Sequence, residues 1–155
     1  MNNRRSFIIG LKSLKLSAKE RMFLKEFKPW GVILFARNIK NIKQASNLTS
    51  SIRKIFNDRK YPILIDQEGG RVNRLKNLIS FDNLTSEFFG NKYINDLKEF
   101  KIYYKLFIDK TSYLLRSIGA NINTVPVLDL RIKGASNVIG DRSFSADPKI
   151  VSRIG

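Results

Sequence analysis

A short apolar run that stops at a group of polar residues constrains the fold of this chain more than any other feature. Residues 61–65 (YPILI) read as a strand buried on both faces, and such strands belong to parallel sheets. The run ends at Asp66, and two glycines, Arg71 and Arg74 follow within eight residues. Polar residues at the end of such a strand build ligand sites in α/β proteins. Carboxylate acceptors and forked guanidinium donors suit a polyhydroxylated or anionic ligand.

Strand-like runs alternate with helix-like stretches along the whole chain. The strands are expected, in chain order, at residues 7–10, 30–35, 61–65 and 120–127. The helices are expected at residues 17–27, 41–56 and 93–118, with a last one opening at residue 147. Residues 66–89 are expected to form a loop, with room for a short helix. This alternation predicts an α/β protein of about four parallel βα units.

The helix ends carry specific signals. Ser17 and Glu20 have the spacing of a capping box at the start of the first helix. Gly119 is a natural stop for the longest helix, since glycine tolerates the left-handed backbone found there. Asp147 and Pro148 suit the N-cap and first turn of the last helix.

Four motifs, in chain order, carry a resemblance to a known family. They read GVILFARN at residues 31–38, DQEGGRV at 66–72, NINTVPVLDL at 121–130 and IGDRSFS at 139–145. Together they resemble glycoside hydrolase family 3, in particular its bacterial cytoplasmic β-N-acetylhexosaminidases of cell-wall recycling. The resemblance extends from Phe7 to the last residue and implies a (β/α)8 barrel. Because a full barrel needs roughly 250 residues and the chain has 155, we expect residues 1–155 to be a truncated N-terminal domain, half of a TIM barrel.

The resemblance also implies a sugar-binding site. Asp66, Arg74 and Arg142 match the family's residues for binding the terminal sugar, and we expect them to converge at the carboxyl ends of the strands. The alternative is structural, with Asp66 capping a turn and the arginines pairing with surface acids. Asn121, Asn123 and Asp129 are further polar candidates, for which a structural role is at least as well supported.

The resemblance assigns no catalytic residue to this chain. In the family the nucleophile is an aspartate from the second half of the barrel, and the acid/base is a histidine in a KHxPGHG segment; this chain contains no histidine. Glu68 lies two residues from Asp66, and two carboxylates about 5 Å apart could act as a retaining catalytic pair. We disfavour this pair, because the two glycines let the chain turn away after Glu68 and the resemblance implies catalytic groups elsewhere. We therefore expect the 155 residues alone to be inactive.

Other polar and aromatic residues are better explained by structure. Arg37 and Asn38 follow a strand, where loop capping is favoured over substrate contact. Four aromatic residues are expected in the core rather than as sugar platforms: Trp30, Tyr103, Tyr104 and Phe107.

Composition excludes several classes of protein. Without cysteine and histidine there is no disulfide, no thiol nucleophile and no typical metal site, so no metal or cofactor is expected. No long apolar span or signal segment is present, and we expect a cytoplasmic protein with no membrane partner. The net charge of +16 permits nucleic-acid binding, but the lysines are dispersed, which favours a solvated surface and no specific nucleic acid.

The function expected of the complete protein is retaining hydrolysis of terminal β-linked N-acetylglucosamine from muropeptide-derived sugars. The expected partners are an N-acetylglucosamine-containing saccharide and a complementing C-terminal half. One alternative is a non-catalytic sugar-binding or regulatory remnant. A weaker one is a basic α/β domain that binds nucleic acid.

Overall fold

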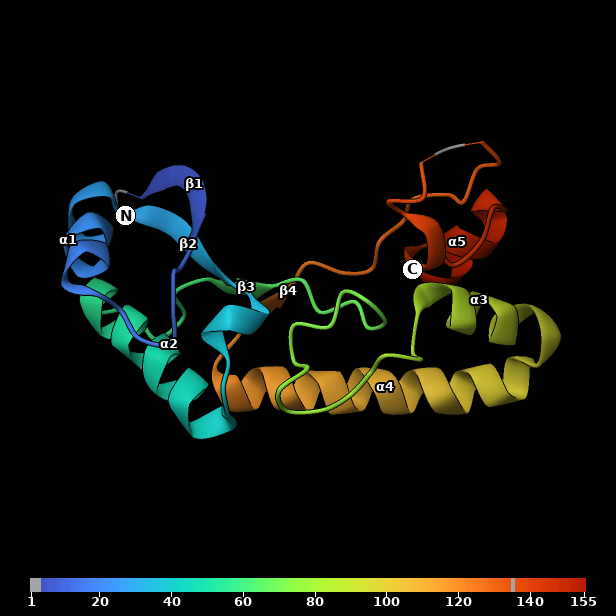
Figure 1. The fold of residues 1–155 in the computed structure, drawn as a ribbon, viewed down its shortest axis with the longest axis horizontal. Helices are drawn as coiled ribbons and strands as arrows, with labels where there is room; N and C mark the ends of the chain where they lie inside the picture. Colours follow the sequence, from blue (N-terminus) through green and yellow to red (C-terminus); the bar gives the residue numbers. More distant parts are fainter. Residues whose placement is uncertain (1–3, 135) are drawn as a thin grey trace. The chain divides into compact units, whose positions relative to one another are not determined.

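The computed structural model describes residues 4–134 and 136–155 (Figure 1). In this part of the chain, four parallel strands form one sheet in the order β1-β2-β3-β4. The strands are β1 (Arg5–Gly10), β2 (Pro29–Leu34), β3 (Ile63–Ile65) and β4 (Ile122–Asn123). The helices are α1 (Ala18–Phe27), α2 (Ile42–Phe56), α3 (Ser86–Asn95), α4 (Leu97–Ile118) and α5 (Pro148–Ile154). The α/β class and the parallel arrangement are as predicted.

The chain divides into two compact units. The sheet unit holds the described residues up to Asp66 together with Arg74–Ile79 and Ser112–Thr124, and therefore contains all four strands. The aromatic unit holds Gln67–Asn73, Ser80–Thr111 and the described residues from Val125 to Gly155. Helix α4 contributes its last turns to the sheet unit and its earlier turns to the aromatic unit.

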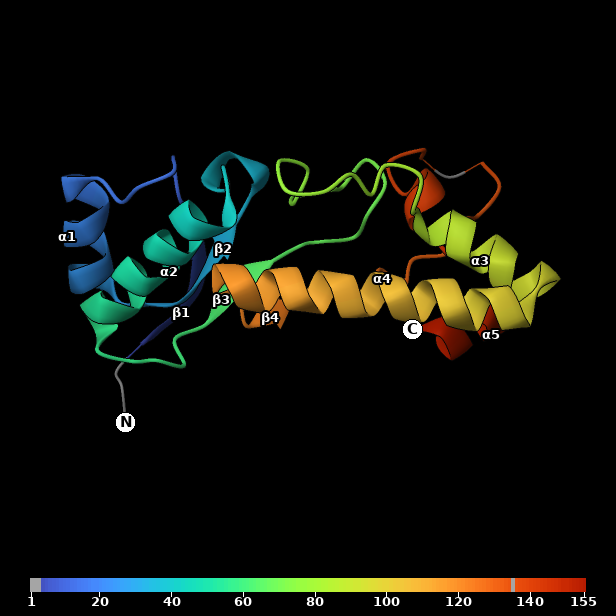
Figure 2. The same cartoon turned by 90° about the horizontal axis from the view of Figure 1, so that it is seen from below.

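Helices α1 and α2 of the sheet unit begin at side-chain caps, of which that of α1 was predicted, and lie side by side (Figure 2). Ser17 accepts a hydrogen bond from the Glu20 amide, while Glu20 accepts one from the Ser17 amide, which completes a capping box. Asn41 caps α2 by accepting from the Gln44 amide. These caps satisfy amides that the helix itself leaves without partners.

The sheet unit has an almost wholly aliphatic core. Its fully buried side chains come from the strands, from α1 and α2 and from the last turns of α4, and include Leu24, Val32, Leu34, Ile52, Ile63, Ile65 and Ile118. Gly119 ends α4 with φ near +80°, and its amide and that of Ala120 bond back to Arg116 and Leu115. This is a Schellman motif, so the helix stop predicted at this glycine is confirmed.

The aromatic unit is held together by rings. Phe89 of α3 lies 4.9 Å from the ring of Tyr104 and 5.1 Å from that of Phe107, both on α4. Phe144 meets Tyr104 edge-on at 6.2 Å, and Val151 of α5 joins the same core. Such tilted and edge-on ring pairs contribute stability beyond the area that they bury.

Three element boundaries differ from the prediction. Residues 93–118 do not form one helix, because Asp96 ends α3 and its side chain accepts from the Glu99 amide as the N-cap of α4. Helix α3 starts at Ser86, capped by Thr85, inside the stretch expected to be a loop. Strands β3 and β4 have three and two residues, shorter than expected. Pro62 and Pro126 lie within the predicted ranges but outside the strands, where a proline would remove a ladder donor.

Two aromatic residues were wrongly expected to be buried. Trp30 is 43% exposed and Tyr103 is 46% exposed, whereas Tyr104 and Phe107 do pack in the aromatic core.

Candidate functional site

Polar side chains of the sheet unit gather where the parallel strands end. Asp66 directly follows β3, and Thr124 directly follows the neighbouring β4. The Thr124 amide extends the ladder to the Ile65 carbonyl at 3.0 Å. The Thr124 hydroxyl donates a hydrogen bond to the Asp66 carboxylate. The ladder thus holds Asp66 and Thr124 together at the carboxyl end of the sheet, where barrel proteins build their sites.

Arg74 approaches the same carboxylate from the other side. Its Nη2 lies 3.7 Å from Oδ2 of Asp66, and the two side chains are 28% and 30% exposed. The Arg74 guanidinium also lies over the ring of Phe35, 5.4 Å from its centroid, and Phe35 is the residue after β2. Asp66 and Arg74 thus form a partly exposed ion pair, in which Arg74 contacts an aromatic ring and Asp66 accepts from a hydroxyl. Carboxylate, guanidinium and hydroxyl groups together form hydrogen bonds of the kind that sugar hydroxyls and amides require.

The structure brings together two of the three predicted sugar-binding residues, Asp66 and Arg74, within the sheet unit. Their role in binding a sugar remains a prediction. Thr124, which contacts Asp66, and Phe35, which contacts Arg74, were not predicted as part of this group. Both lie inside resemblance motifs and directly follow strands, so their position at strand ends was the signal that could have found them.

Arg142, the third predicted residue, belongs to the aromatic unit. Its Nε and Nη2 donate to the two carboxylate oxygens of Glu68, each at 2.7 Å. The Glu68 side chain is only 8% exposed, whereas that of Arg142 is 25% exposed. Because Arg142 binds both Glu68 oxygens, Glu68 is arranged as an ion-pair partner. This supports the sequence argument against Glu68 as half of a catalytic carboxylate pair.

A tight turn sets the position of Glu68. The Glu68 amide donates to the Val72 carbonyl, and the Val72 amide donates to the Gly69 carbonyl. Gly69 and Gly70 both have positive φ, and a Cβ on Gly69 would lie 2.2 Å from the Leu84 carbonyl oxygen. Only glycine fits there. Within this unit the two glycines therefore allow the tight turn.

Arg71, on the same turn, contacts the segment that carries Arg142. Its Nε donates to Asp141 at 2.8 Å, and its Nη2 lies 2.6–3.1 Å from the carbonyl oxygens of residues 137–139. The segment ends in a 3₁₀ turn, Gly140–Arg142. The turn at residues 68–72 therefore contacts both the backbone and the side chains of that segment.

The structural alternative holds for three other polar candidates, Arg37, Asn38 and Asn121. Arg37 and Asn38 both donate to the Leu11 carbonyl, and Asn38 also accepts from the Phe35 amide, so they cap the loops that follow β1 and β2. Asn121 accepts from the Ile63 amide and donates to the carbonyls of residues 60 and 61. It therefore bridges β3 and the start of β4.

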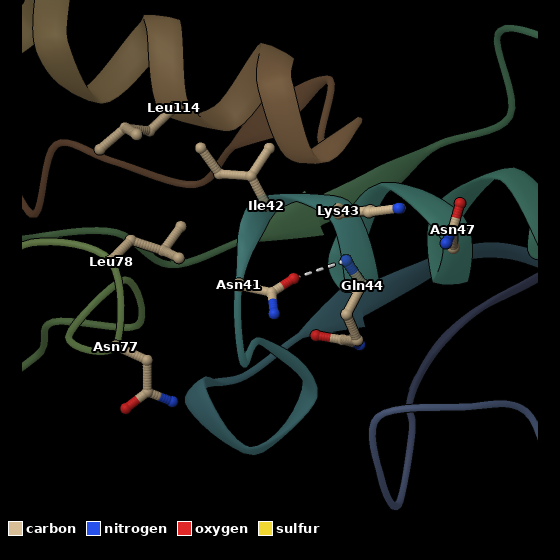
Figure 3. A pocket seen from close by; sticks show the side chains of 8 residues that line it. All are labelled: Asn41, Ile42, Lys43, Gln44, Asn47, Asn77, Leu78 and Leu114. Atoms are coloured by element: carbon tan, nitrogen blue, oxygen red, sulfur yellow. Dashed lines mark hydrogen bonds between the residues drawn. The ribbon is translucent and has the colours of Figure 1, made fainter.

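An open groove of about 680 Å³ lies elsewhere in the sheet unit (Figure 3). It is lined by Ile42, Leu78 and Leu114 together with Asn41, Gln44 and other polar residues, but not by Asp66 or Arg74. The amides of this groove serve the backbone, since Asn41 caps α2 and Gln44 donates to the carbonyls of Leu14 and Asn38. The groove therefore offers few polar groups for recognising a ligand.

No group of three or more acidic, cysteine or histidine residues capable of holding a metal occurs among the described residues. Within the same residues, no helix is long and apolar enough to cross a membrane.

A parallel sheet with acidic and basic side chains at its carboxyl ends defines the general class, an α/β protein of the kind that builds ligand sites at this edge. Residues 6–155 match the family model described as the glycosyl hydrolase family 3 N terminal domain. This match covers nearly all of the chain, and the chain belongs to that family.

Known proteins of the family are similar over the same region. A β-hexosaminidase of Xanthomonas euvesicatoria pv. vesicatoria is 35% identical over 147 residues, which cover 94% of this chain and 42% of that protein. NagZ from Neisseria gonorrhoeae, solved in complex with zinc ion, aligns with a TM-score of 0.85 and 28% identity, over 97% of this chain and 45% of that one. The same protein solved with N-trifluoroacetyl-D-glucosamine aligns with a TM-score of 0.74 and 27% identity, over 97% and 45%.

The 155 residues span less than half the length of these relatives. Together with the four parallel strands, this coverage makes the fold the N-terminal half of a (β/α)8 barrel, as predicted.

Proposed function

We propose that this chain provides part of the sugar-binding site of a β-N-acetylhexosaminidase that removes terminal β-linked N-acetylglucosamine. The observation that carries the proposal is the Asp66–Arg74 pair at the carboxyl end of β3 in a chain of this family. A carboxylate beside a guanidinium offers acceptors and donors to neighbouring hydroxyl and acetamido groups of one sugar ring. Arg142, in the aromatic unit, is proposed as a further sugar-binding residue.

Two comparisons support the choice of sugar. Curated relatives at 33–35% identity carry the name β-hexosaminidase. A similar solved structure, that of NagZ, holds N-trifluoroacetyl-D-glucosamine. We infer that the natural substrates are muropeptide-derived sugars and that the protein acts in the cytoplasm, as the resemblance to cell-wall recycling enzymes implies.

The catalytic groups would come from a complementing C-terminal half. The chain contains no histidine, and the resemblance assigns both the acid/base and the nucleophile to the second half of the barrel. A retaining mechanism needs both groups, since one protonates the leaving group while the other forms the glycosyl-enzyme bond. We therefore propose that the 155 residues bind sugar but do not hydrolyse it alone.

The direct test joins the chain to the second half of a relative's barrel and measures turnover of a chromogenic N-acetylglucosaminide. We expect turnover from the joined protein and none from the chain alone. Asp66→Ala should reduce kcat/KM by about 100-fold or more, because hydrogen bonds from a charged group to sugar hydroxyls strengthen in the transition state. Asp109→Asn is the matched control, since it also removes one carboxylate but from an exposed ion pair on α4. Unchanged kinetics in Asp66→Ala would mean that Asp66 is only a turn residue.

The muropeptide inference has its own test. The joined protein should hydrolyse a disaccharide of N-acetylglucosamine and anhydro-N-acetylmuramic acid with a higher kcat/KM than it shows for chitobiose. A preference for chitobiose would contradict the cell-wall substrate but leave the sugar-binding site intact.

A further inference from the structure

We propose that Glu68 and Arg71 are positioning residues that together hold Arg142 in the orientation needed for a ligand. This inference deepens the proposed function and rests on it, since Arg142 is taken to contact the sugar. Neither residue needs to touch the sugar itself, because both act on the segment of residues 137–142 within the aromatic unit.

Glu68 controls the plane of the Arg142 guanidinium. A carboxylate that receives both Nε and Nη2 at 2.7 Å fixes the direction in which the rest of the guanidinium points. Glu68 is nearly buried, so removing its charge would leave a partly buried arginine without a counter-ion. Without Glu68, the Arg142 side chain would have to be ordered on each binding event, and this entropy cost would offset much of its contribution to binding.

Arg71 controls the backbone that carries Arg142. Its guanidinium lies against three consecutive carbonyl oxygens at residues 137–139 and pairs with Asp141. The turn that follows is closed by the amides of Arg142 and Ser143, which donate to the carbonyls of Ile139 and Gly140. Arg71 thus ties down the residues directly before that turn.

The signs of the four charges fix the register. The turn at residues 68–72 presents Glu68 and Arg71, and the facing segment presents Arg142 and Asp141 in the complementary order. A shift of the segment by one residue would set Glu68 against Asp141 in one direction, or Arg71 against Arg142 in the other. Like charges in contact repel each other. The four charges therefore stabilise the observed register and also destabilise a shifted one.

The first experiment observes Arg142 without any sugar. In ¹⁵N-labelled chain, the Nε–Hε signal of Arg142 should be resolved and slow to exchange with solvent, because Glu68 accepts from it. Glu68→Gln should speed that exchange about tenfold or more, and Arg71→Gln should do the same for the backbone amides of residues 142 and 143. Asp109→Asn should change neither signal. An Arg142 signal that exchanges equally fast in the wild type and in Glu68→Gln would overturn the proposal.

A second variant guards against simple unfolding. If Glu68→Gln abolishes the near-ultraviolet circular dichroism of the aromatic unit, Glu68→Asp is compared instead, because it keeps the charge but shortens the side chain by one methylene. In Glu68→Asp, an exchange rate of the Arg142 Nε–Hε proton that lies between the rates of the wild type and of a free arginine supports the positioning role. Wild-type exchange in Glu68→Asp contradicts it.

The kinetic experiment separates this inference from the proposed function. In the joined enzyme, Arg142→Ala tests whether Arg142 binds the sugar, and Glu68→Gln tests whether Glu68 positions it. We expect Arg142→Ala to impair kcat/KM and Glu68→Gln to impair it less, about tenfold, at a temperature where both variants are folded. If Arg142→Ala lowers kcat/KM but Glu68→Gln leaves it at the wild-type value, only the positioning role is overturned. If Arg142→Ala leaves kcat/KM at the wild-type value, the sugar contact is overturned, and the exchange experiment still tests whether Glu68 orients Arg142.

Discussion

The sheet unit and the aromatic unit are stabilised in different ways. The sheet unit buries aliphatic side chains from alternating strands and helices, so its core follows from a repeating local pattern. The aromatic unit has no strand among its described residues and packs rings from α3, α4 and the segment around Phe144. Its central ion pair joins residues 74 positions apart. The comparison teaches that regular structure positions Asp66, whereas contacts distant in sequence position Arg142.

The largest expected effect comes from replacing one large buried side chain with alanine in each core. Phe89→Ala should cost about 3–5 kcal/mol and Ile52→Ala about 2–5 kcal/mol, since both side chains are almost fully buried. Trp30, the single tryptophan, lies on β2, so its fluorescence reports on the sheet unit. Near-ultraviolet circular dichroism includes the ring contacts of the aromatic unit, so a change in its midpoint that Trp30 fluorescence does not share reports on that unit.

In urea, we expect Phe89→Ala to lower the midpoint of the circular dichroism signal more than that of Trp30 fluorescence, and Ile52→Ala to do the reverse. Coincident transitions in both variants would show that the two units unfold as one cooperative body, and the distinction between them would then be one of composition only.

A smaller effect is expected where α3 meets the segment that carries Arg142. A Cβ on Gly90 would lie 1.7 Å from the Phe144 carbonyl oxygen. Gly90→Ala must therefore push the helix and the segment apart, and it should destabilise the aromatic unit by about 1–3 kcal/mol. Gly134→Ala is the matched control, because no atom lies within 4 Å of its Cβ position and only its positive φ of 83° adds strain. Equal midpoints for the two variants would mean that this contact is not tight in solution.

In the sheet unit, removing the buried Tyr61 hydroxyl should lower the free energy of unfolding by about 1 kcal/mol. The Tyr61 hydroxyl donates to the Pro29 carbonyl at 2.8 Å, and burial raises the pKa of this phenol well above its ordinary value, against the opposing charge of Arg4. Tyr61→Phe would leave the Pro29 carbonyl without this donor. We expect a lower midpoint of Trp30 fluorescence in urea and an unchanged signal from the aromatic unit. A variant as stable as the wild type would show that water replaces the donor.

The smallest effect is a pH dependence at the start of α1. Burial alone would raise the pKa of Glu20, but hydrogen bonds from the amides of Lys12 and Ser17 outweigh it, and the pKa is lowered. A carboxyl whose pKa is lower in the folded state stabilises the protein above its unfolded pKa, and this stability is lost as the pH falls through the folded value.

Glu20→Gln should therefore cost less than about 1 kcal/mol at pH 7, since glutamine also serves in capping boxes and the site is exposed. The difference between variant and wild type should shrink below about pH 4, where the glutamate is itself protonated. If the difference in the free energy of unfolding stays constant from pH 7 to pH 3, the Glu20 charge does not contribute to stability.

The sequence by itself determined the regular part of the protein. Apolar runs located all four strands, and the capping residues Ser17 and Asp147 located helix starts, because the signals for these elements lie within a few neighbouring residues. The position of Asp66 followed from the same logic, since a residue directly after a buried parallel strand must lie at the carboxyl end of the sheet. The break at Asp96 was missed because apolar spacing continues across it, and only the cap to Glu99 separates the two helices.

Only the tertiary structure decided the partners of the charged side chains. Nothing local to Glu68 indicates whether it will face Arg142 or solvent, because its partner lies far along the chain and the ion pair depends on how a glycine turn packs on the Leu84 carbonyl. Thr124 became a neighbour of Asp66 through the register of β4 on β3, which spacing along the chain does not encode. Secondary structure depends on periodicity over short distances, whereas the geometry of a site depends on contacts closed by the whole fold, and for this reason the strands could be predicted and the arrangement around Arg142 could not.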